Sequence, residues 1–256
     1  MIRLDLIIAQ RLGVSREEAR DIILCGQVLV DGIAYTKPGR KLGDSGAIEI
    51  LSENGHVDGV REYVSRGGYK LAAAFSAFKI DVNGLVCLDV GASTGGFTDC
   101  LLKNGAAKVY AVENGSNQLV PGLLDNPRVV SLENTDIRNV EPDWFAEIIK
   151  FAVVDVSFIS LTRVLEPICR VLALDAALVC LIKPQFEVGQ KFLNKRGIVR
   201  DVNACNRAVQ NILDFAGAVG LKSIGVVPVP PSGLKGQVPL KDKNQEYLAY
   251  FLRKNT

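Results

Sequence analysis

The spacing of apolar residues predicts several short elements near the start of the chain. Apolar side chains in residues 4–12 recur three to four positions apart, which predicts a helix with one buried face. A second helix is expected after Ser15, because Ser15 and Glu18 have the spacing of a capping box. Residues 28–30 and 47–51 predict short strands. Together these elements make a compact α+β module.

A different pattern begins near residue 84, where apolar runs alternate with helical stretches. Strands are predicted at residues 85–90, 108–113, 129–133, 151–156 and 177–183, and helices near residues 96–104, 116–125, 142–149, 161–173 and 203–219. Two further strands are expected at residues 222–229 and 246–252. Regular alternation of strand and helix predicts a parallel sheet covered by helices on both faces.

The change of pattern divides the chain into domains. We predict a small α+β domain at residues 1–60, a linker at residues 61–69 and a larger domain at residues 70–256. The predicted fold class is α/β, with the parallel sheet in the larger domain.

Composition narrows the function classes. The chain has 256 residues, of which 48% are hydrophobic and 23% are charged, as in ordinary globular proteins. Its one histidine, His56, excludes most histidine-based metal sites and any mechanism that needs two imidazoles; we expect no metal. The six cysteines form no CxxC pair, and most lie in apolar runs, which suits buried thiols in a reducing cytosol.

No membrane association is expected either. The first residues lack the charged, apolar and small-residue order of a signal peptide. No apolar run approaches the roughly 20 residues that a membrane-spanning helix needs. The sequence therefore predicts a cytoplasmic protein.

Charge is unevenly distributed along the chain. The formal net charge of +2 is a sum of −2 over residues 1–60, −3 over residues 61–180 and +7 over residues 181–256. Five cations of the basic last part lie close together in sequence: Lys191, Lys195, Arg196, Arg200 and Arg207. This segment is either a solvated surface or a contact surface for a polyanion, and the sequence leaves both open.

A glycine-rich turn follows the first predicted strand of the larger domain. It reads Asp89-Val90-Gly91-Ala92-Ser93-Thr94-Gly95-Gly96-Phe97 and leads into a predicted helix. Glycines let the backbone approach a ligand closely, and a helix N-terminus offers unpaired N–H groups. The spacing matches neither the dinucleotide fingerprint nor a phosphate loop. A ligand with a carboxylate fits, such as the methionine end of S-adenosylmethionine.

Acidic residues follow the next two predicted strands. Glu113 ends one strand, where a carboxylate can accept both hydroxyls of a ribose. Asp136 follows the next and could meet an adenine. Each alone could be an ordinary loop carboxylate, but their place after successive strands favours a nucleoside cofactor.

Two lysines and two further carboxylates are expected at the same sheet edge. Lys183 and Asp155 end neighbouring predicted strands, Lys70 follows a Gly-Gly turn, and Glu246 opens the last strand. Ligands of open α/β sheets bind at this edge. A partly buried lysine can lose its proton and act as a general base. Any one of the four could be a plain strand-end charge, but four together are less easily accidental.

Several stretches of the sequence, including these residues, resemble those of a known family. The stretches that match are Arg3-Leu4-Asp5, residues 15–20, 63–71 and 89–100, Asp155-Val156-Ser157-Phe158-Ile159-Ser160-Leu161 and Lys183-Pro184-Gln185-Phe186-Glu187-Val188-Gly189. Residues 70–256 resemble FtsJ-like ribose 2′-O-methyltransferases. The whole chain is similar to the TlyA type, also called hemolysin, which joins an S4 RNA-binding domain to that enzyme. The resemblance implies a Rossmann-like S-adenosylmethionine-dependent sheet behind a small S4-like domain.

The resemblance also implies residue roles. The catalytic tetrad would be Lys70, Asp155, Lys183 and Glu246, with Lys183 as the base. The cofactor would be S-adenosylmethionine, held by Asp89, by the loop from Gly91 to Phe97, and by Glu113, Asp136 and Asp155. The family usually has Asp at the position of Glu113, and the longer side chain should still reach.

The partner implied by the resemblance is ribosomal RNA or a ribosomal subunit, with cytidine as the target nucleoside. Because the small domain lacks net positive charge, RNA binding there would rest on a local face: Arg3, Arg16, Arg20, Lys37, Arg40 and Lys41. Two alternatives stay open: an RNA-binding protein without catalysis, and a membrane-lytic hemolysin.

Overall fold

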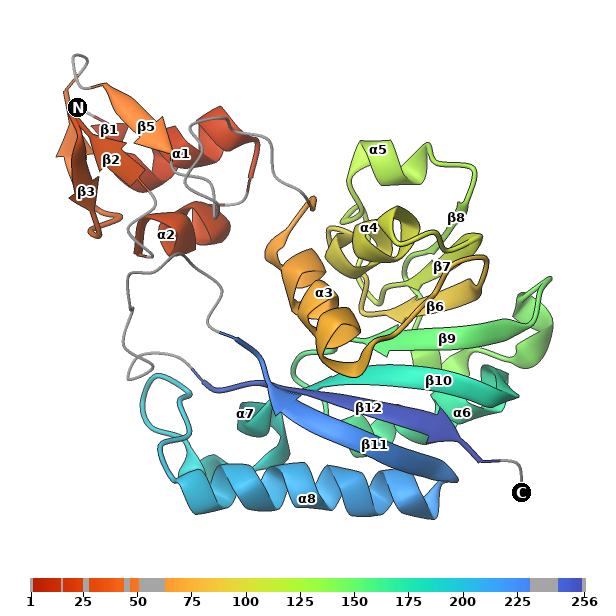
Figure 1. Ribbon diagram of the computed structural model, residues 1–256. Coiled ribbons are helices and arrows are strands. Elements are labelled where there is room, and N and C mark those ends of the chain that lie inside the picture. Colours follow the sequence, from red (N-terminus) through yellow and green to blue (C-terminus); the bar gives the residue numbers. More distant parts are fainter. Residues whose placement is uncertain are drawn as a thin grey trace. The chain divides into compact units, whose positions relative to one another are not determined.

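A computed structural model describes residues 2–14, 16–24, 28–43, 47–50, 63–230 and 244–254 (Figure 1). These residues fall into two compact units, one ending at Ile50 and one beginning at Tyr63. Ser15, His56 and one of the six cysteines, Cys25, lie outside the described residues, as does the side chain of Glu18. No helix among the described residues is long and apolar enough to cross a bilayer.

The first unit packs two helices against small antiparallel sheets. Its elements are β1 (Ile2–Arg3), α1 (Leu4–Leu12), α2 (Arg16–Leu24), β2 (Val28–Val30), β3 (Ile33–Tyr35), β4 (Lys41–Leu42) and β5 (Ile48–Ile50). The strand order is β3-β2-β5, with β1 paired to β4. Helix α1 ends at Gly13, whose φ of 63° is the left-handed conformation that glycine adopts without strain. Leu4, Ile8 and Ile23 are fully buried in the core, as the predicted helical faces require.

The second unit is one seven-stranded sheet with helices. Its strands are β6 (Val86–Val90), β7 (Lys108–Val112), β8 (Val129–Leu132), β9 (Ile149–Val154), β10 (Leu172–Ile182), β11 (Leu221–Pro228) and β12 (Tyr247–Arg253). Its α-helices are α3 (Arg66–Phe78), α4 (Gly96–Lys103), α5 (Pro121–Leu124), α6 (Leu165–Val171), α7 (Pro184–Glu187) and α8 (Val202–Ala218). The strand order is β11-β12-β10-β9-β6-β7-β8. This confirms the predicted α/β class.

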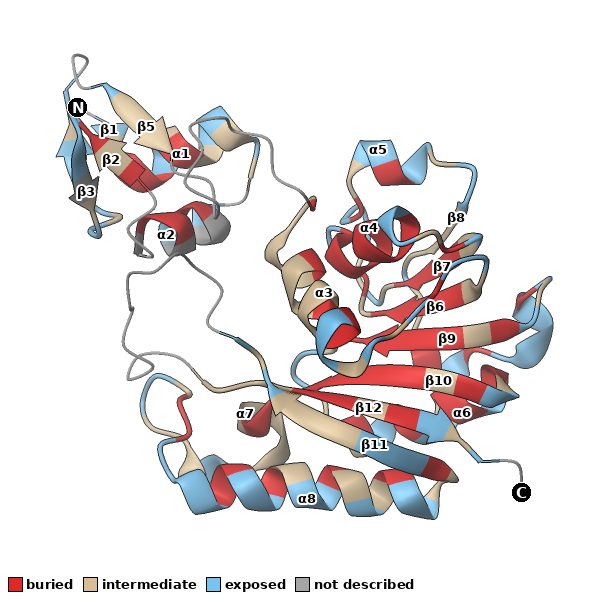
Figure 2. Cartoon of the chain, in the orientation of Figure 1, coloured by how far each residue is buried: buried red, intermediate tan, exposed pale blue. Residues whose placement is uncertain are grey.

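Two apolar layers cover the sheet because alternate residues of a strand point to opposite faces. In β9, Phe151 and Val153 pack with α3, α4 and α5, whereas Ala152 and Val154 pack with α6 and α8. Figure 2 shows the central strands as the most continuously buried part of the unit. Such burial on both faces makes the sheet a rigid platform for the loops at its strand ends.

The structure differs from the sequence prediction in several places. Strands β8, β7, β6, β9 and β10 are parallel, but β12 is antiparallel to both of its neighbours, so the sheet is mixed. The helix expected at 116–125 is only α5, and 142–149 holds a short 3₁₀ turn, Pro142–Trp144. Helix α3 begins at Arg66, inside the expected linker 61–69.

Candidate active site

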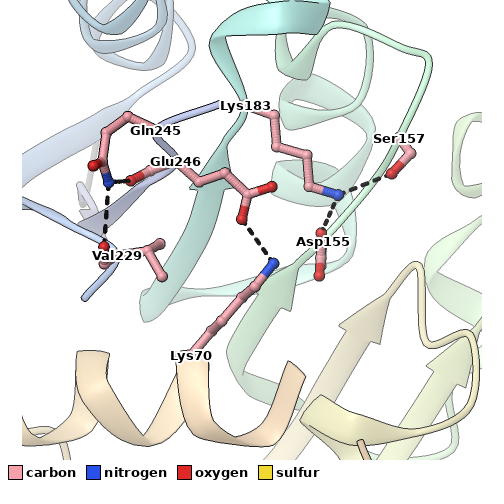
Figure 3. Close-up of polar contacts among 7 residues, drawn as sticks. All are labelled: Lys70, Asp155, Ser157, Lys183, Val229, Gln245 and Glu246. Atoms are coloured by element: carbon pink, nitrogen blue, oxygen red, sulfur yellow. Dashed lines mark hydrogen bonds and ion pairs between the residues drawn. The ribbon is translucent and has the colours of Figure 1, made fainter. Parts of the chain in front are cut away.

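Two ion pairs lie at the carboxyl edge of the parallel strands (Figure 3). Lys70 Nζ lies 2.7 Å from Glu246 Oε2, and Lys183 Nζ lies 2.5 Å from Asp155 Oδ1. The four side chains retain only 11% to 21% of their exposed surface. Ion pairs with so little solvent around them are held more firmly than surface pairs.

Strand order explains why these residues meet. Asp155 directly follows β9, Lys183 directly follows β10, and Glu246 directly precedes β12. Strand β10 lies between β9 and β12, and Ile182 is paired with Tyr247. Because β12 runs antiparallel, its beginning meets the end of β10. Lys70 arrives from α3, which packs against β12. The structure thus brings together the four residues of the expected tetrad.

Lys183 has a second polar partner that the sequence did not indicate. Its Nζ donates to the hydroxyl of Ser157 at 2.8 Å. Ser157 lies in the loop after β9, two residues beyond Asp155, and is exposed. The lysine amine therefore has one ion-pair partner, Asp155, and one neutral hydrogen-bond acceptor, Ser157.

Glu187 connects the two loops of the Lys183 pair. Its carboxylate accepts hydrogen bonds from the Ser160 hydroxyl at 2.6 Å and from the Leu161 amide at 2.9 Å. Burial raises the pKa of Glu187, although these two hydrogen bonds oppose the shift. Glu187 belongs to the quoted Lys-Pro-Gln-Phe-Glu stretch, so the sequence contained it, but nothing in spacing alone revealed its partner.

The glycine-rich turn connects β6 to α4 beside this edge. Gly91 has φ of 84°, and a Cβ there would lie 2.5 Å from the Asp155 carbonyl oxygen. Glycine is therefore required for the turn to lie against the loop that carries Asp155. The Ala92 amide and the Thr94 carbonyl also form backbone hydrogen bonds within this region. The side chain of Phe97, at the end of the turn, is 3% exposed and packs in the core; its contact with a cofactor stays a prediction.

A second glycine contact holds the turn against α3. A Cβ on Gly96 would lie 3.0 Å from the Gly68 amide, and a Cβ on Gly68 would lie 2.4 Å from the Tyr63 side chain. Gly95, with φ of 95°, is the residue before α4. The helix that carries Lys70 is thereby packed directly on the glycine-rich turn.

Glu113 and Glu133 organise the loops after β7 and β8. Glu113 accepts from the Ser93 amide at 2.9 Å and from the Gly115 amide at 2.8 Å, which places its carboxylate next to the glycine-rich turn. Glu133 accepts from the amides of Asn117, Gln118 and Leu119. These backbone hydrogen bonds lower the pKa of Glu133. The sequence gives no indication of this role for Glu133, because hydrogen bonds within loops leave no regular spacing of residues.

Asp89 is buried beneath the turn. It accepts from the Thr98 hydroxyl at 2.7 Å through Oδ2. Oδ1 has no hydrogen-bond partner among the described residues. Burial, opposed by the Thr98 hydrogen bond and reinforced by the charges of Asp155 and Glu113, raises the pKa of Asp89 to about 7.

Asp136 is engaged by a neighbour. Its carboxylate accepts from the Arg138 amide at 2.9 Å and forms an ion pair with the guanidinium of the same arginine. The Arg138 hydrogen bond holds the pKa of Asp136 below its usual range. Any contact with an adenine would share this carboxylate with Arg138.

The expected RNA-binding face of the first unit contains an ion-pair network. Arg3 and Arg16 both bind the fully buried Asp5, at 2.7 and 3.2 Å. The Arg3 hydrogen bond is the main reason that the pKa of Asp5 falls to about 2. Arg20, Lys37 and Lys41 are exposed, and Arg40 lies over the Tyr35 ring.

The basic part of the second unit includes a small hairpin at residues 190–200, bridged from Leu193 to Val199. Asn244 fixes this hairpin, because its amide group accepts from the Val199 amide and donates to the Gly197 carbonyl. The hairpin is therefore tied to the segment that carries Glu246, two residues further on. Its cations Lys191, Lys195, Arg196 and Arg200 are exposed.

Sequence comparison identifies both units. The profile of FtsJ-like methyltransferases matches residues 63–239, more than half of the chain, and the profile of the S4 domain matches residues 2–48. The chain belongs to the FtsJ-like methyltransferase family. The sequence-based expectation of this family, with an S4 domain in front, is confirmed.

Relatives of this FtsJ-like protein resemble it over nearly its whole length. Hemolysin A of Brachyspira hyodysenteriae is 42% identical over 93% of this chain and 94% of that protein. The 16S/23S rRNA (cytidine-2′-O)-methyltransferase TlyA of Mycobacterium tuberculosis is 40% identical over 92% of this chain and 87% of that protein. A solved hemolysin-named structure from Streptococcus thermophilus has a TM-score of 0.77 at 36% identity, covering 100% and 89% of the two chains.

Proposed function

We propose that this protein is an S-adenosylmethionine-dependent ribose 2′-O-methyltransferase that acts on ribosomal RNA, with cytidine as the target. The observation that carries the proposal is the pair of lysine–carboxylate contacts, Lys70–Glu246 and Lys183–Asp155, beside a glycine-rich turn. The relative from M. tuberculosis, named for this reaction, supports the choice of substrate. A cytoplasmic location, where ribosomes work, is part of the proposal.

The residues around the turn suit S-adenosylmethionine. Glu113 has a backbone-fixed carboxylate at the end of β7, where ribose hydroxyls are accepted in such sheets. The unpartnered buried oxygen of Asp89 leaves a hydrogen-bonding position open beneath the turn, which suits a cofactor with a polar amine. When bound, the cofactor supplies the methyl group. Asp89, Glu113 and residues 91–96 would hold it.

Lys183 is the proposed general base. The 2′-hydroxyl O–H bond would break, and a new N–H bond would form at Lys183 Nζ. The oxygen would keep the electron pair and bond to the methyl carbon as the carbon–sulfur bond of the sulfonium breaks and leaves its electron pair on sulfur. Asp155 orients the amine at 2.5 Å. Lys70, held by Glu246, lies at the same edge of the sheet.

Alignment of the reacting atoms should contribute more to the reaction rate than removal of the hydroxyl proton does. General-base catalysis contributes typically ~10²–10⁴ in rate. Correct positioning of the reacting atoms can contribute about 7–11 kcal/mol. The rigid sheet edge that holds all four residues therefore supports the proposal as much as the identity of the base does.

RNA would bind both units. The exposed cations Arg20, Lys37 and Lys41 of the S4 unit are proposed phosphate contacts, with Arg3, Arg16 and Arg40 as fixed members of the same face. In the second unit, the basic hairpin at residues 190–200 is a further proposed contact. Phosphate contacts of this kind supply affinity and strong salt dependence.

The proposal is tested with purified protein, ribosomal RNA or subunits, and labelled cofactor. Lys183→Ala should abolish methyl transfer while cofactor binding by calorimetry stays largely intact. Lys150→Ala is a matched control, since Lys150 lies at the opposite end of β9 and pairs with the exposed Asp175. Digestion of the product should yield 2′-O-methylcytidine. Wild-type turnover by Lys183→Ala would refute the assigned base.

The two alternatives predict other outcomes. A non-catalytic RNA-binding protein would bind RNA but transfer no methyl group and bind no S-adenosylmethionine. A membrane-lytic protein, which the name of the Brachyspira relative raises, would release dye from liposomes at concentrations at which methyl transfer is measured. We expect cofactor binding and no leakage.

A further inference from the structure

Ser157 lies where it can direct the lone pair of the Lys183 amine. Its hydroxyl oxygen accepts a hydrogen bond from Lys183 Nζ at 2.8 Å. Asp155 Oδ1 lies 2.5 Å from the same nitrogen, on a different side of it (Figure 3). We propose that Ser157 is a positioning residue, which together with Asp155 aims the lone pair of Lys183 at the substrate hydroxyl. The inference rests on the proposed role of Lys183 as the base.

This inference follows from the tetrahedral geometry of the lysine amine nitrogen. A neutral lysine amine has two N–H bonds, one lone pair and the bond to Cε, arranged as a tetrahedron. Ser157 already accepts one N–H, whereas Asp155 is held by an ion pair in which its Oδ1 has no aligned hydrogen bond among the described residues. Once Asp155 accepts the other N–H of the neutral amine, the lone pair must occupy the single remaining direction. With Asp155 alone, the amine could rotate about the Cε–Nζ bond, and the lone pair would sample several directions. Two acceptors are thus the minimum that orients this base.

The chemistry of the second acceptor also suits a base. A second carboxylate near Lys183 would favour the charged ammonium, which has no lone pair. The serine hydroxyl accepts a hydrogen bond without adding charge. After proton transfer, the ammonium has three N–H groups, of which one is donated to Ser157 and one faces its ion-pair partner Asp155. The third is the newly formed N–H bond, directed at the methylated oxygen.

The loop that carries Ser157 is held firmly enough for this role. Glu187 accepts from Ser160 and from the Leu161 amide, three and four residues beyond Ser157. Glu187 ends α7, which begins directly after Lys183. The base and its neutral acceptor are therefore joined twice, once through their own hydrogen bond and once through Glu187.

Ser157 is suited to a clean substitution test. Because it is exposed, Ser157→Ala leaves no buried cavity, and the extra methyl group of Ser157→Thr has room. The threonine variant keeps the accepting hydroxyl. Ser76→Ala is the matched control, since Ser76 is an exposed serine of α3.

The experiment measures kcat and KM for ribosomal RNA, cofactor Kd by calorimetry, and Tm. For Ser157→Ala we expect kcat to fall about ten-fold, as misalignment of a reacting group does, with KM, Kd and Tm unchanged. Ser157→Thr and Ser76→Ala should both keep kcat near the wild-type value.

Three results would overturn the inference: an unchanged kcat in Ser157→Ala, an equal loss in Ser157→Thr, or a loss that appears only in KM or Tm. The last would make Ser157 an RNA contact or a structural residue. An inactive Lys183→Ala together with a fully active Ser157→Ala would refute only this inference and leave the proposed function intact.

Discussion

Lys70 Nζ lies 2.7 Å from Glu246 Oε2, although the two residues are 176 positions apart in the chain. Neither side chain has another partner of opposite charge among the ion pairs of the described residues. Each therefore fixes the other at the edge of the sheet, and loss of either should release its partner.

A double-mutant cycle tests this relationship. Lys70→Met and Glu246→Gln should each reduce kcat, and the double variant should be little worse than the poorer single variant, because both remove the same contact. Coupling between contacting residues is typically about 0.5–3 kcal/mol. Effects that simply add would show that the two residues act independently.

Removal of the Glu187 carboxylate should loosen the loop after β9. Glu187→Ala leaves the Leu161 amide and the Ser160 hydroxyl without their acceptor, which should cost about 1–3 kcal/mol of unfolding free energy. Glu187→Gln keeps an accepting oxygen and should cost less. Urea unfolding measures both variants. Equal stability of Glu187→Ala and wild type would contradict the role of Glu187 as a link between the loops.

Asp89 should make stability depend on pH. The pKa of Asp89 is about 7 in the folded state, above the ordinary value of 3.8. At pH values between these two, the folded protein keeps a proton on Asp89 that the unfolded protein has lost. Stability from this group is therefore greatest at low pH and falls as pH rises from about 4 to 7, by at most about 1.4 kcal/mol per pH unit.

The comparison is between wild type and Asp89→Asn, unfolded without cofactor across this pH range. The variant lacks the titrating group, so its stability should fall less steeply with pH. Parallel curves for the two proteins would show that Asp89 stays ionised when folded. Asp5 has the opposite sign: its pKa of about 2 adds stability above pH 3.8 that is lost as pH falls toward 2.

The contact between α3 and the glycine-rich turn leaves no room for a side chain. A Cβ on Gly68 would lie 2.4 Å from the Tyr63 side chain and 3.0 Å from the Gly96 carbonyl oxygen. Gly68→Ala should therefore cost about 1–3 kcal/mol in stability and weaken cofactor binding, as seen by calorimetry. Gly217→Ala, at an exposed position of α8 with open space around it, should be neutral or slightly stabilising.

Alanine substitutions of Arg20 and Arg16 in the S4 unit should have different effects on RNA affinity and on Tm. Arg20→Ala removes an exposed cation and should reduce the slope of log affinity against log salt by about one, with no change in Tm. Arg16→Ala also removes a partner of buried Asp5, so its Tm should fall. An unchanged salt slope for Arg20→Ala would exclude this helix face as an RNA contact.

Much of the fold could be predicted because its signals are local. Alternating runs predicted β6, β7, β8, β9 and β10 to within a few residues, and α1 spans the predicted residues 4–12. The direction of β12 could not be predicted, since pairing across the sheet depends on tertiary order rather than on any local pattern. Residues 142–149 have helical spacing, yet Pro142 begins only a 3₁₀ turn and β9 takes over at Ile149.

Some residues of the candidate site could likewise be predicted from the sequence, and others could not. Lys183 and Asp155 could be predicted because each directly follows a strand. Ser157 and Glu187 could not, because their contacts join loops 26 and 27 positions apart, through geometry that only the fold supplies. Phe97 belongs to the matching motif, and its ring is buried in the core, which the motif alone does not reveal.

The placement of β12 has a consequence for how the protein is made. This strand fits between β10 and β11, both of which precede it in the chain. During synthesis, those two strands keep facing edges without hydrogen-bond partners, the kind of edge at which nascent chains associate wrongly. Glu246 emerges with the strand that closes this gap. Insertion of β12 therefore covers the edges that would otherwise aggregate, and it also adds the last of the four charged site residues. A chain that lacks β12 has neither a continuous sheet nor a complete tetrad.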